Sequence, residues 1–146
     1  MAKSYKTLFI AFIVVFVIDQ AIKLIFLNGF GWESKCIDLV LTFNTGVAFS
    51  MFSSLGPYLK YIQIALLVGV FSYIFWEKKI LSEYALALGL ILGGGVSNVL
   101  DRFTQKGVVD YIYWHCGFDF AIFNFADMMI NLGVAIILWI SFRKKD

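Results

Sequence analysis

Four apolar runs, each long enough to cross a lipid bilayer, constrain the fold of this chain more than any other feature. A helix needs roughly 20 residues to span the hydrocarbon core. Backbone polar groups in lipid must be paired within the segment, which leaves helices as the form for runs of this length. The sequence therefore predicts an all-α polytopic membrane protein with four transmembrane helices. The runs cover about residues 8–27, 59–76, 84–100 and 121–142.

The composition agrees with a membrane location. Of the 146 residues, 61% are hydrophobic and only 15% are charged, whereas about a quarter of the residues in a soluble domain are charged. The length suits one domain, so we expect residues 1–146 to form a single membrane-embedded domain. The first run holds Asp19 and Lys23 and is too long for a cleaved signal peptide. The net charge of +2 gives no reason to expect a nucleic-acid partner.

Basic residues lie at three sites that four spans would place on one side of the membrane. Lysine and arginine gather on the cytoplasmic side of multi-pass proteins. The pattern predicts that both termini are cytoplasmic and that the segments at about 28–58 and 101–120 are extracytoplasmic. The sites lie before the first run, between the second and third, and after the fourth: Lys3 and Lys6; Lys78 and Lys79; Arg143, Lys144 and Lys145.

Two stretches outside the apolar runs have the composition of strands. Residues 38–52 are rich in β-branched and aromatic side chains and contain Asn-Thr-Gly at 44–46 as a turn signal. We expect short strands there, lying on the membrane surface. Residues 108–114 predict a strand or an interfacial segment, because their tyrosines and tryptophan suit the headgroup level.

Cys36 and Cys116 fall in the two predicted extracytoplasmic segments and match no metal or redox spacing. We expect two free, partly buried thiols. A disulfide is the alternative if the compartment is oxidising.

Small residues recur at every fourth position of the third apolar run, at Ala85, Gly89, Gly93 and Ser97. This spacing places them on one helix face, where a neighbouring helix can approach closely. The pattern predicts a helix-packing surface.

Polar side chains in and beside the apolar runs all fall at the same predicted membrane depth. Ionisable groups in a bilayer core cost several kcal/mol (about 3 on insertion scales) and are rare unless they have a function. Helix ends carrying such residues could converge on one polar pocket near the extracytoplasmic surface. The groups are Asp19 and Lys23; Asn98, Asp101 and Arg102; Asp110; and Asn124, Asp127 and Asn131.

Purely structural roles are open for most of these residues. Asp19 and Lys23, four positions apart, share a helix face and can form an ion pair. Asp101 and Arg102 could pin a loop, and the asparagines could satisfy backbone groups. His115 is interpreted as an interface residue. Asp110 and Asp127 are the acids least easily matched with a base near in sequence.

Paired carboxylates are the chemistry that this inventory favours. The sequence has no zinc-binding HExxH or CxxC motif and no glycine-rich phosphate loop, and adjacent His115 and Cys116 rarely face each other. We therefore expect no metal and no cofactor. Two aspartates held close share a proton, so that one can act as base and the other as acid. Seventeen positions separate Asp110 from Asp127 (127 − 110), so only tertiary folding could bring them together.

Five stretches of the chain have the order and spacing of a known motif set: IDQAIK (18–23), FNTGVAFS (43–50), GGGVSNVLDRF (93–103), VVDY (108–111) and FAIFNFAD (120–127). Together, on four predicted spans, they resemble lipoprotein signal peptidase, also called signal peptidase II, across nearly the whole chain. Two positions depart from the family pattern. Ser97 stands where glycine is usual, and Ala121 where proline is usual.

The resemblance implies a four-helix aspartic endopeptidase of the bacterial inner membrane with a small extracytoplasmic β-cradle. The family cleaves diacylglyceryl-modified prolipoproteins on the amino side of the lipidated cysteine. The catalytic pair would be Asp110 and Asp127, and we expect a monomer whose partners are this substrate and membrane lipid. The residues that fall on pocket-shaping motif positions are Asp19, Lys23, Asn44, Gly46, Ala48, Asn98, Asp101, Arg102, Asn124 and Ala126.

Two other functions compete with this reading. A small proton-coupled transporter or channel subunit could use intramembrane Asp, Lys and Arg as a relay. Its acids would lie nearer the midplane, and many transporters have internal repeats, which this sequence lacks. A non-catalytic assembly factor would leave Asp110 and Asp127 unexplained.

Overall fold

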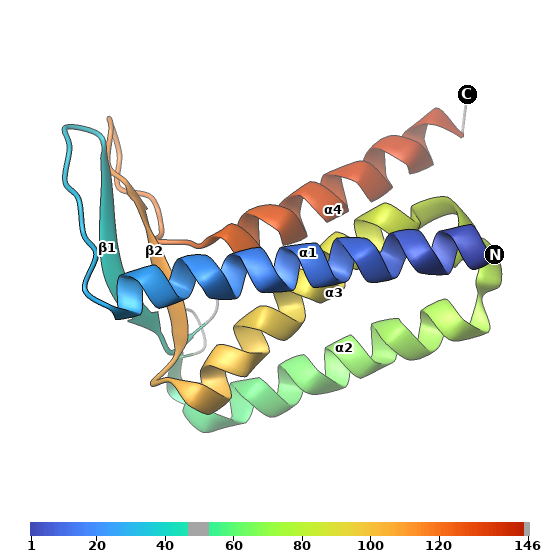
Figure 1. Cartoon of the computed structure of the whole chain (residues 1–146), viewed down its shortest axis with the longest axis horizontal. Coiled ribbons are helices and arrows are strands. Elements are labelled where there is room, and N and C mark those ends of the chain that lie inside the picture. Colours follow the sequence, from blue (N-terminus) through green and yellow to red (C-terminus); the bar gives the residue numbers. More distant parts are fainter. Residues whose placement is uncertain (47–52, 145–146) are drawn as a thin grey trace.

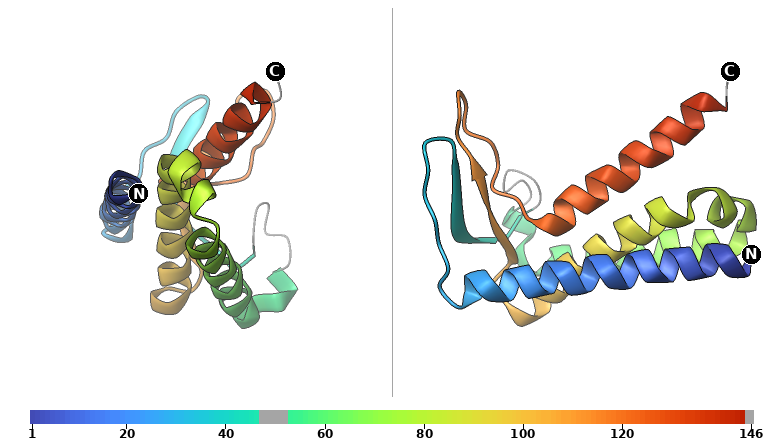
Figure 2. Two further views of the ribbon diagram at one scale, coloured as in Figure 1. Left: turned by 90° about the vertical axis from the view of Figure 1, so that its right-hand side faces the viewer. Right: turned by 45° about the horizontal axis from the view of Figure 1, so that its top comes forward.

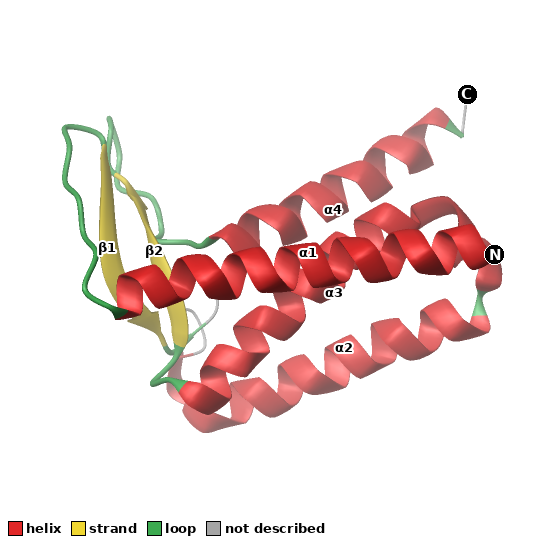
Figure 3. Cartoon of the chain, viewed as in Figure 1, coloured by secondary structure: helices red, strands yellow, loops and turns green. Residues whose placement is uncertain are grey.

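Four long helices, one short 3-10 helix and a two-stranded sheet form the part of the chain that the computed structural model describes, residues 1–46 and 53–144 (Figures 1 and 3). The sheet lies across one end of the helices, which we call the cradle end. The elements in chain order are α1 (Ala2–Leu27), β1 (Ile37–Asn44), η2 (Ser53–Tyr58), α2 (Leu59–Trp76), α3 (Lys78–Thr104), β2 (Val108–Trp114) and α4 (Phe125–Arg143).

The long helices have the length and apolar character that a membrane span requires. Their most apolar windows have mean hydropathies between 1.5 and 2.4. Large apolar side chains such as Phe9, Leu66 and Trp139 are exposed on their outer surfaces, as expected where lipid rather than water is the solvent. The predicted architecture, four spanning helices with a small sheet, is confirmed.

Helix α3 is the centre of the bundle. It packs against each of the other three long helices, and it lies between α1 on one side and α2 and α4 on the other in the left view of Figure 2. Half of its most apolar window is buried inside the protein, against 11–22% for the other three helices. Leu81, Leu88 and Leu92 on α3 belong to the buried core.

The sheet joins two segments that are distant in the sequence. β1 pairs antiparallel with β2, with Ile37 opposite Trp114 and Asn44 opposite Val108, and the register shifts between Leu39 and Thr42. Strands are thus found in both stretches whose composition predicts them. The later part of the first stretch, including Ala48, lies outside the described residues.

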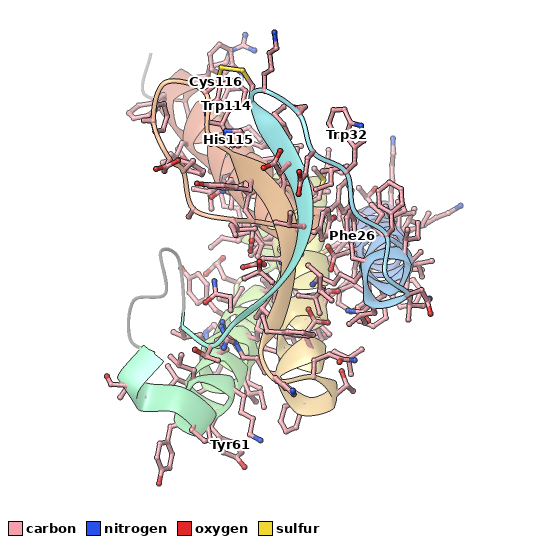
Figure 4. The ribbon with its side chains drawn as sticks, turned by 90° about the vertical axis from the view of Figure 1, so that its left-hand side faces the viewer. Phe26, Trp32, Tyr61, Trp114, His115 and Cys116 are labelled. Carbon is pink, nitrogen blue, oxygen red and sulfur yellow. A yellow bond between two sulfur atoms is a disulfide. The ribbon has the colours of Figure 1, made fainter. Side chains whose placement is uncertain are left out.

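The expectation of two free thiols is wrong, because Cys36 and Cys116 form a disulfide. Pairing of Ile37 with Trp114 brings the flanking residues together at the end of the strand pair, where Cys116 and Trp114 are labelled in Figure 4. The backbone amide of His115 also donates to the carbonyl oxygen of Cys36 at 3.0 Å. The two cysteines are 80 positions apart, so only the strand pairing reveals that they can bond.

The predicted stripe of small residues brings the backbones of α1 and α3 into contact. A Cβ atom at Gly89 would lie 2.6 Å from the carbonyl oxygen of Leu8, and one at Gly93 would lie 2.7 Å from that of Phe12. No hydrophobic force drives helices together in lipid, so close packing of this kind carries much of the association energy.

We expect Gly89→Ala to destabilise the protein by about 1–3 kcal/mol, because the added methyl group must push two backbones apart. The matched control is Gly69→Ala on α2, where a Cβ atom would meet nothing within 4 Å. That change should be neutral or stabilising by up to about 1 kcal/mol, since alanine favours the helix. Unfolding in detergent micelles measures both variants. Equal midpoints for the two would contradict the close helix contact.

Candidate active site

Helix α4 begins with a capping box that fixes Asp127. The side chain of Asn124 accepts from the backbone amide of Asp127 at 2.9 Å, and the carboxylate of Asp127 accepts from the backbone amide of Asn124 at 3.2 Å. This exchange satisfies two amides that the helix leaves unpaired. It also explains why α4 starts at Phe125, whereas the apolar run begins at residue 121.

Asparagine side chains hold Asp110 and Asp127 on one hydrogen-bonded network. Asn124 Nδ2 donates to Asp110 Oδ1 at 2.7 Å, and Asn44 Nδ2 donates to Asp110 Oδ2 at 3.0 Å. Asn98 Nδ2 donates to Asp127 Oδ1 at 2.8 Å, while its Oδ1 accepts from Asn124 at 3.1 Å. Asn124 therefore contacts both acids, which come from β2 and α4.

A buried ammonium group lies behind this network. Lys23 Nζ is 2.6 Å from Asp19 Oδ2 and 2.7 Å from Asp101 Oδ2, and it donates to Asn98 Oδ1 at 2.8 Å. Lys23, Asp19 and Asp101 are each no more than 2% exposed. Asp19 and Lys23 thus form the ion pair that their spacing allows, and Asp101 completes it from α3.

The same two carboxylates hold the backbone next to each acid of the network. Asp19 Oδ1 accepts from the backbone amide of Ala126 at 2.8 Å, immediately before Asp127. Asp101 Oδ2 accepts from the backbone amide of Val109 at 3.1 Å, immediately before Asp110. The charged cluster therefore fixes the two chain segments that carry Asp110 and Asp127.

Arg102 secures the end of the other strand. Its Nη2 donates to the carbonyl oxygen of Gly46, and its Nη1 lies 3.5 Å from the carbonyl oxygens of Asn44 and Thr45. Adjacent Asp101 and Arg102 thus pin the sheet through different strands, Asp101 through β2 and Arg102 through β1.

A cavity of about 560 Å³ opens onto both acids. Its polar wall carries the carboxylates of Asp110 and Asp127, and its other wall is apolar. Gln63 on α2 also lines it, with a buried Oε1 atom that has no hydrogen-bond partner among the described residues. A smaller cavity of about 170 Å³, lined by α2, α3 and α4, shares Gln63, Asn98 and Ile130 with it. The other lining residues of the larger cavity are Asn44, Gly46, Asn98, Arg102, Val108, Phe120, Ala121, Ile122, Phe123, Met128, Ile130 and Asn131.

Burial decides the protonation of Asp110, whose side chain lies in β2 outside the spanning helices. Burial, reinforced by the charge of Asp127, raises the pKa of Asp110 from 3.8 to about 7. Hydrogen bonds from Asn44 and Asn124, and the charge of Lys23, oppose this rise in the pKa without cancelling it. Asp110 therefore can hold a proton at neutral pH, as a carboxylic acid that donates a proton must.

Several sequence-predicted residues have roles that only their contacts reveal. Ala126 is fully buried. Ser97, which stands where the family usually has glycine, donates through Oγ to Asp19 Oδ2 at 2.6 Å, so a hydroxyl fits this position. The departure Ala121 lines the large cavity. Ala48 lies outside the described residues. Within residues 1–46 and 53–144 no cluster of three potential metal ligands occurs.

Three polar residues at the site were missed by the sequence reasoning. Gln20 donates to Ser97 Oγ at 2.8 Å and to Asp101 Oδ1 at 2.9 Å. The hydroxyl of Tyr111, whose ring stacks on Phe26 (labelled in Figure 4), accepts from the backbone amide of Phe125 at 3.0 Å. Gln63 is the third. Gln20 and Gln63 are polar residues within apolar runs, which is a signal that could have found them.

The fold and the site define a class of protein: a multi-pass membrane protein with two hydrogen-bonded carboxylates on one cavity at a helix-bundle end. A family model described as signal peptidase (SPase) II matches residues 11–143. The chain belongs to this family, and the resemblance that its five motifs indicate is confirmed.

Two similar proteins, both named lipoprotein signal peptidase, match nearly the whole chain. Lipoprotein signal peptidase of Wolinella succinogenes is 52% identical over 92% of this chain and 92% of its own. That of Helicobacter pylori (strain Shi470) is 51% identical over 99% of this chain and 92% of its own. A solved bacterial membrane enzyme, at 25% identity, superposes with a TM-score of 0.83 over 97% of this chain and 90% of that one.

We expect Lys23→Met to destabilise the protein by about 3–5 kcal/mol, because it leaves two buried carboxylates without their cation. The control is Lys144→Met, which breaks an ion pair with Glu83 whose side chains are 49% and 25% exposed. Exposed pairs contribute about 0–1 kcal/mol. Denaturant unfolding in micelles gives both values. Losses of similar size would contradict the anchoring role of Lys23.

Replacing Asp110 should change how stability depends on pH. The folded state keeps the Asp110 proton up to about pH 7, whereas an unfolded chain releases it near 3.8. Raising the pH through this range therefore destabilises the folded wild-type protein. The unfolding midpoint of Asp110→Asn should rise relative to wild type as the pH goes from about 4 to about 8. Asp119→Asn, at an exposed carboxylate, is the control. A difference between Asp110→Asn and wild type that is independent of pH would refute the buried proton.

Proposed function

We propose that this protein is an aspartic endopeptidase that removes the signal peptide from diacylglyceryl-modified bacterial prolipoproteins. Cleavage would fall on the amino side of the lipidated cysteine, with Asp110 and Asp127 as the catalytic pair. The observation that carries this proposal is that both carboxylates share Asn124 and line one cavity. The family and the named relatives support the substrate class.

In the proposed reaction the pair shares one proton. The ionised aspartate takes a proton from a water molecule, and the oxygen of that water attacks the carbonyl carbon of the scissile peptide. The protonated aspartate donates to the carbonyl oxygen, giving a tetrahedral diol. The C–N bond then breaks as the aspartate that took the proton from water gives it to the departing nitrogen, while the other aspartate takes a proton from one hydroxyl of the diol. A carboxyl group and a free amine remain, and the pair again holds one proton. The two acids titrate as a pair, so the pH profile belongs to both.

The walls of the cavity suit an extended peptide that continues into a lipid-embedded segment. Asn44 and Gly46 lie where β1 ends, so substrate backbone could hydrogen-bond beside this strand. The Oε1 atom of Gln63 has no hydrogen-bond partner within residues 1–46 and 53–144. It could accept from an N–H group of the substrate, which would satisfy a buried acceptor. The smaller apolar cavity between α2, α3 and α4 offers room for the apolar part of the substrate.

The proposed orientation places both termini in the cytoplasm and the site at the extracytoplasmic face. The N-terminus and the end of α4 lie opposite the sheet (Figure 1), as does the junction of α2 and α3 with Lys78 and Lys79. The basic residues that mark the cytoplasmic side thus share one end. The disulfide Cys36–Cys116 is at the other end, which suits an oxidising compartment.

A proton-coupled transporter remains the alternative of a different class. It calls for acids along the bundle near its middle. The buried acids of the described helices instead gather at the cradle end, where Asp101 contacts β2 and Asp19 contacts the first turn of α4. The cleavage assay below separates the two functions.

Asp110→Asn and Asp127→Asn should each abolish cleavage, with losses of at least about 10³-fold, because a proton carrier is removed from the reaction. The substrate is a synthetic prolipoprotein peptide, with or without diacylglyceryl on its cysteine, and mass spectrometry locates the cut. Wild type should cleave the lipidated peptide just before the cysteine. The unlipidated peptide should be cut far more slowly.

The control is Asp119→Asn. Asp119 is an exposed acid that is not among the residues lining the cavity, so this variant should cleave at the wild-type rate. Each variant is first shown to be folded at the assay pH by a single cooperative unfolding transition. Normal cleavage by either dyad variant would refute the catalytic pair. Failure of folded wild type to cut the lipidated peptide would refute the function, and proton flux in liposomes would then be measured.

A further inference from the structure

Another cavity, of about 300 Å³, lies at the cradle end where α2 begins and α3 ends. Among the described residues its lining is basic and contains no acidic side chain. We propose that it binds the phosphate group of an anionic membrane phospholipid such as phosphatidylglycerol. The lining residues are Thr45, Gly56, Pro57, Lys60, Arg102, Lys106 and Gly107.

Two lysines give this cavity its uncompensated charge. The ammonium group of Lys60, in the first turn of α2, lies 4.7 Å from the ring centroid of Phe103 and 5.3 Å from that of Tyr61. Lys106 follows the end of α3 and is exposed. Within the described part of the chain neither lysine takes part in an ion pair. A phosphate between them would gain charge-assisted hydrogen bonds from both.

Arg102 also lines this cavity, but its role differs from that of the lysines. Its guanidinium is occupied by the carbonyl oxygens that follow β1, and it also lines the larger cavity. An anion held by the lysines would therefore sit beside the residue that pins the end of β1. Gly107 lets the chain pass close to that end, since a Cβ atom there would lie 2.6 Å from the carbonyl oxygen of Asn44.

The surroundings of the cavity favour a lipid over a soluble anion. Tyr58, Tyr61 and Phe103 are more than half exposed beside it, and Tyr61 extends away from the helices in Figure 4. Exposed aromatic side chains at the ends of spanning helices mark the headgroup level of a bilayer. The cavity thus opens where phospholipid phosphates lie.

The distribution of positive charge points the same way, given the proposed orientation. Lysine and arginine are depleted on the extracytoplasmic side of multi-pass proteins. Beyond the buried Lys23, the chain has four basic residues there, Lys35, Lys60, Arg102 and Lys106, and three of them line this one cavity. The diacylglyceryl group of the proposed substrate carries no phosphate, so the occupant is a separate lipid.

The test measures binding to the purified, delipidated full chain in a neutral detergent. Short-chain phosphatidylglycerol should raise the thermal unfolding midpoint in a saturable way. Phosphatidylcholine of equal chain length and inorganic phosphate, at the same concentrations, should not. Each lysine charge near the bilayer surface changes binding roughly fivefold. The double variant Lys60→Gln/Lys106→Gln should therefore bind phosphatidylglycerol about 25-fold more weakly.

The matched control is Lys3→Gln/Lys35→Gln, which removes the same charge at two exposed sites outside the cavity and should keep wild-type lipid binding. If the double variant does not fold, Lys106→Gln alone, at an exposed position after α3, should still lose about fivefold. An equal response to phosphatidylcholine would overturn the proposal, as would lipid binding retained in the double variant. A response to inorganic phosphate equal to that of phosphatidylglycerol would assign the cavity to a free anion and overturn the lipid. No peptide is cleaved in this test, so its result is independent of the proposed proteolysis.

Discussion

The cradle end of the protein depends on one buried ammonium group. Lys23 Nζ lies within 2.7 Å of Asp19 and Asp101, in surroundings that exclude solvent almost entirely. Removing one partner from a buried ion pair is strongly destabilising, so Lys23 is the partner on which both buried acids depend. The two carboxylates also accept from backbone amides: Asp101 Oδ2, which faces Lys23, accepts from Val109 on β2, and the other oxygen of Asp19, Oδ1, accepts from Ala126 on α4.

Electrostatic anchoring and proposed chemistry are arranged in two layers. In the inner layer, Asp19 and Asp101 pair with Lys23 and hold the neighbouring backbone in place. The outer layer, Asp110 and Asp127, accepts hydrogen bonds from the neutral amides of Asn44, Asn98 and Asn124, and within residues 1–46 and 53–144 neither acid forms an ion pair. Burial then raises the pKa of Asp110 to about 7, which a proton-sharing pair requires. Aspartate thus anchors the backbone where it lies beside Lys23, and is proposed to carry a proton where its close partners are neutral amides.

The sheet forms part of the wall of the large cavity. Asp101 holds β2 and Arg102 holds the end of β1, while the disulfide closes the far edge. The cavities of about 300 and 560 Å³ lie against this sheet and share Arg102. A phospholipid on Lys60 and Lys106 would therefore sit next to the proposed peptide-binding strand, so the bilayer itself could support the cradle.

The sequence by itself determined the four spans, the packing stripe on α3 and the polar residues at one end of the helices, because hydropathy and helical periodicity are local properties. Motif order was enough to indicate the family. Tertiary structure alone decided three things. It brought Asp110 and Asp127 onto one network across 17 positions, it paired Cys36 with Cys116, and it gave Gln20 and Ser97 their partners. Each depends on how β1 and β2 pair and on how α1 and α4 pack against α3, and such long-range contacts leave no periodic signal in the chain.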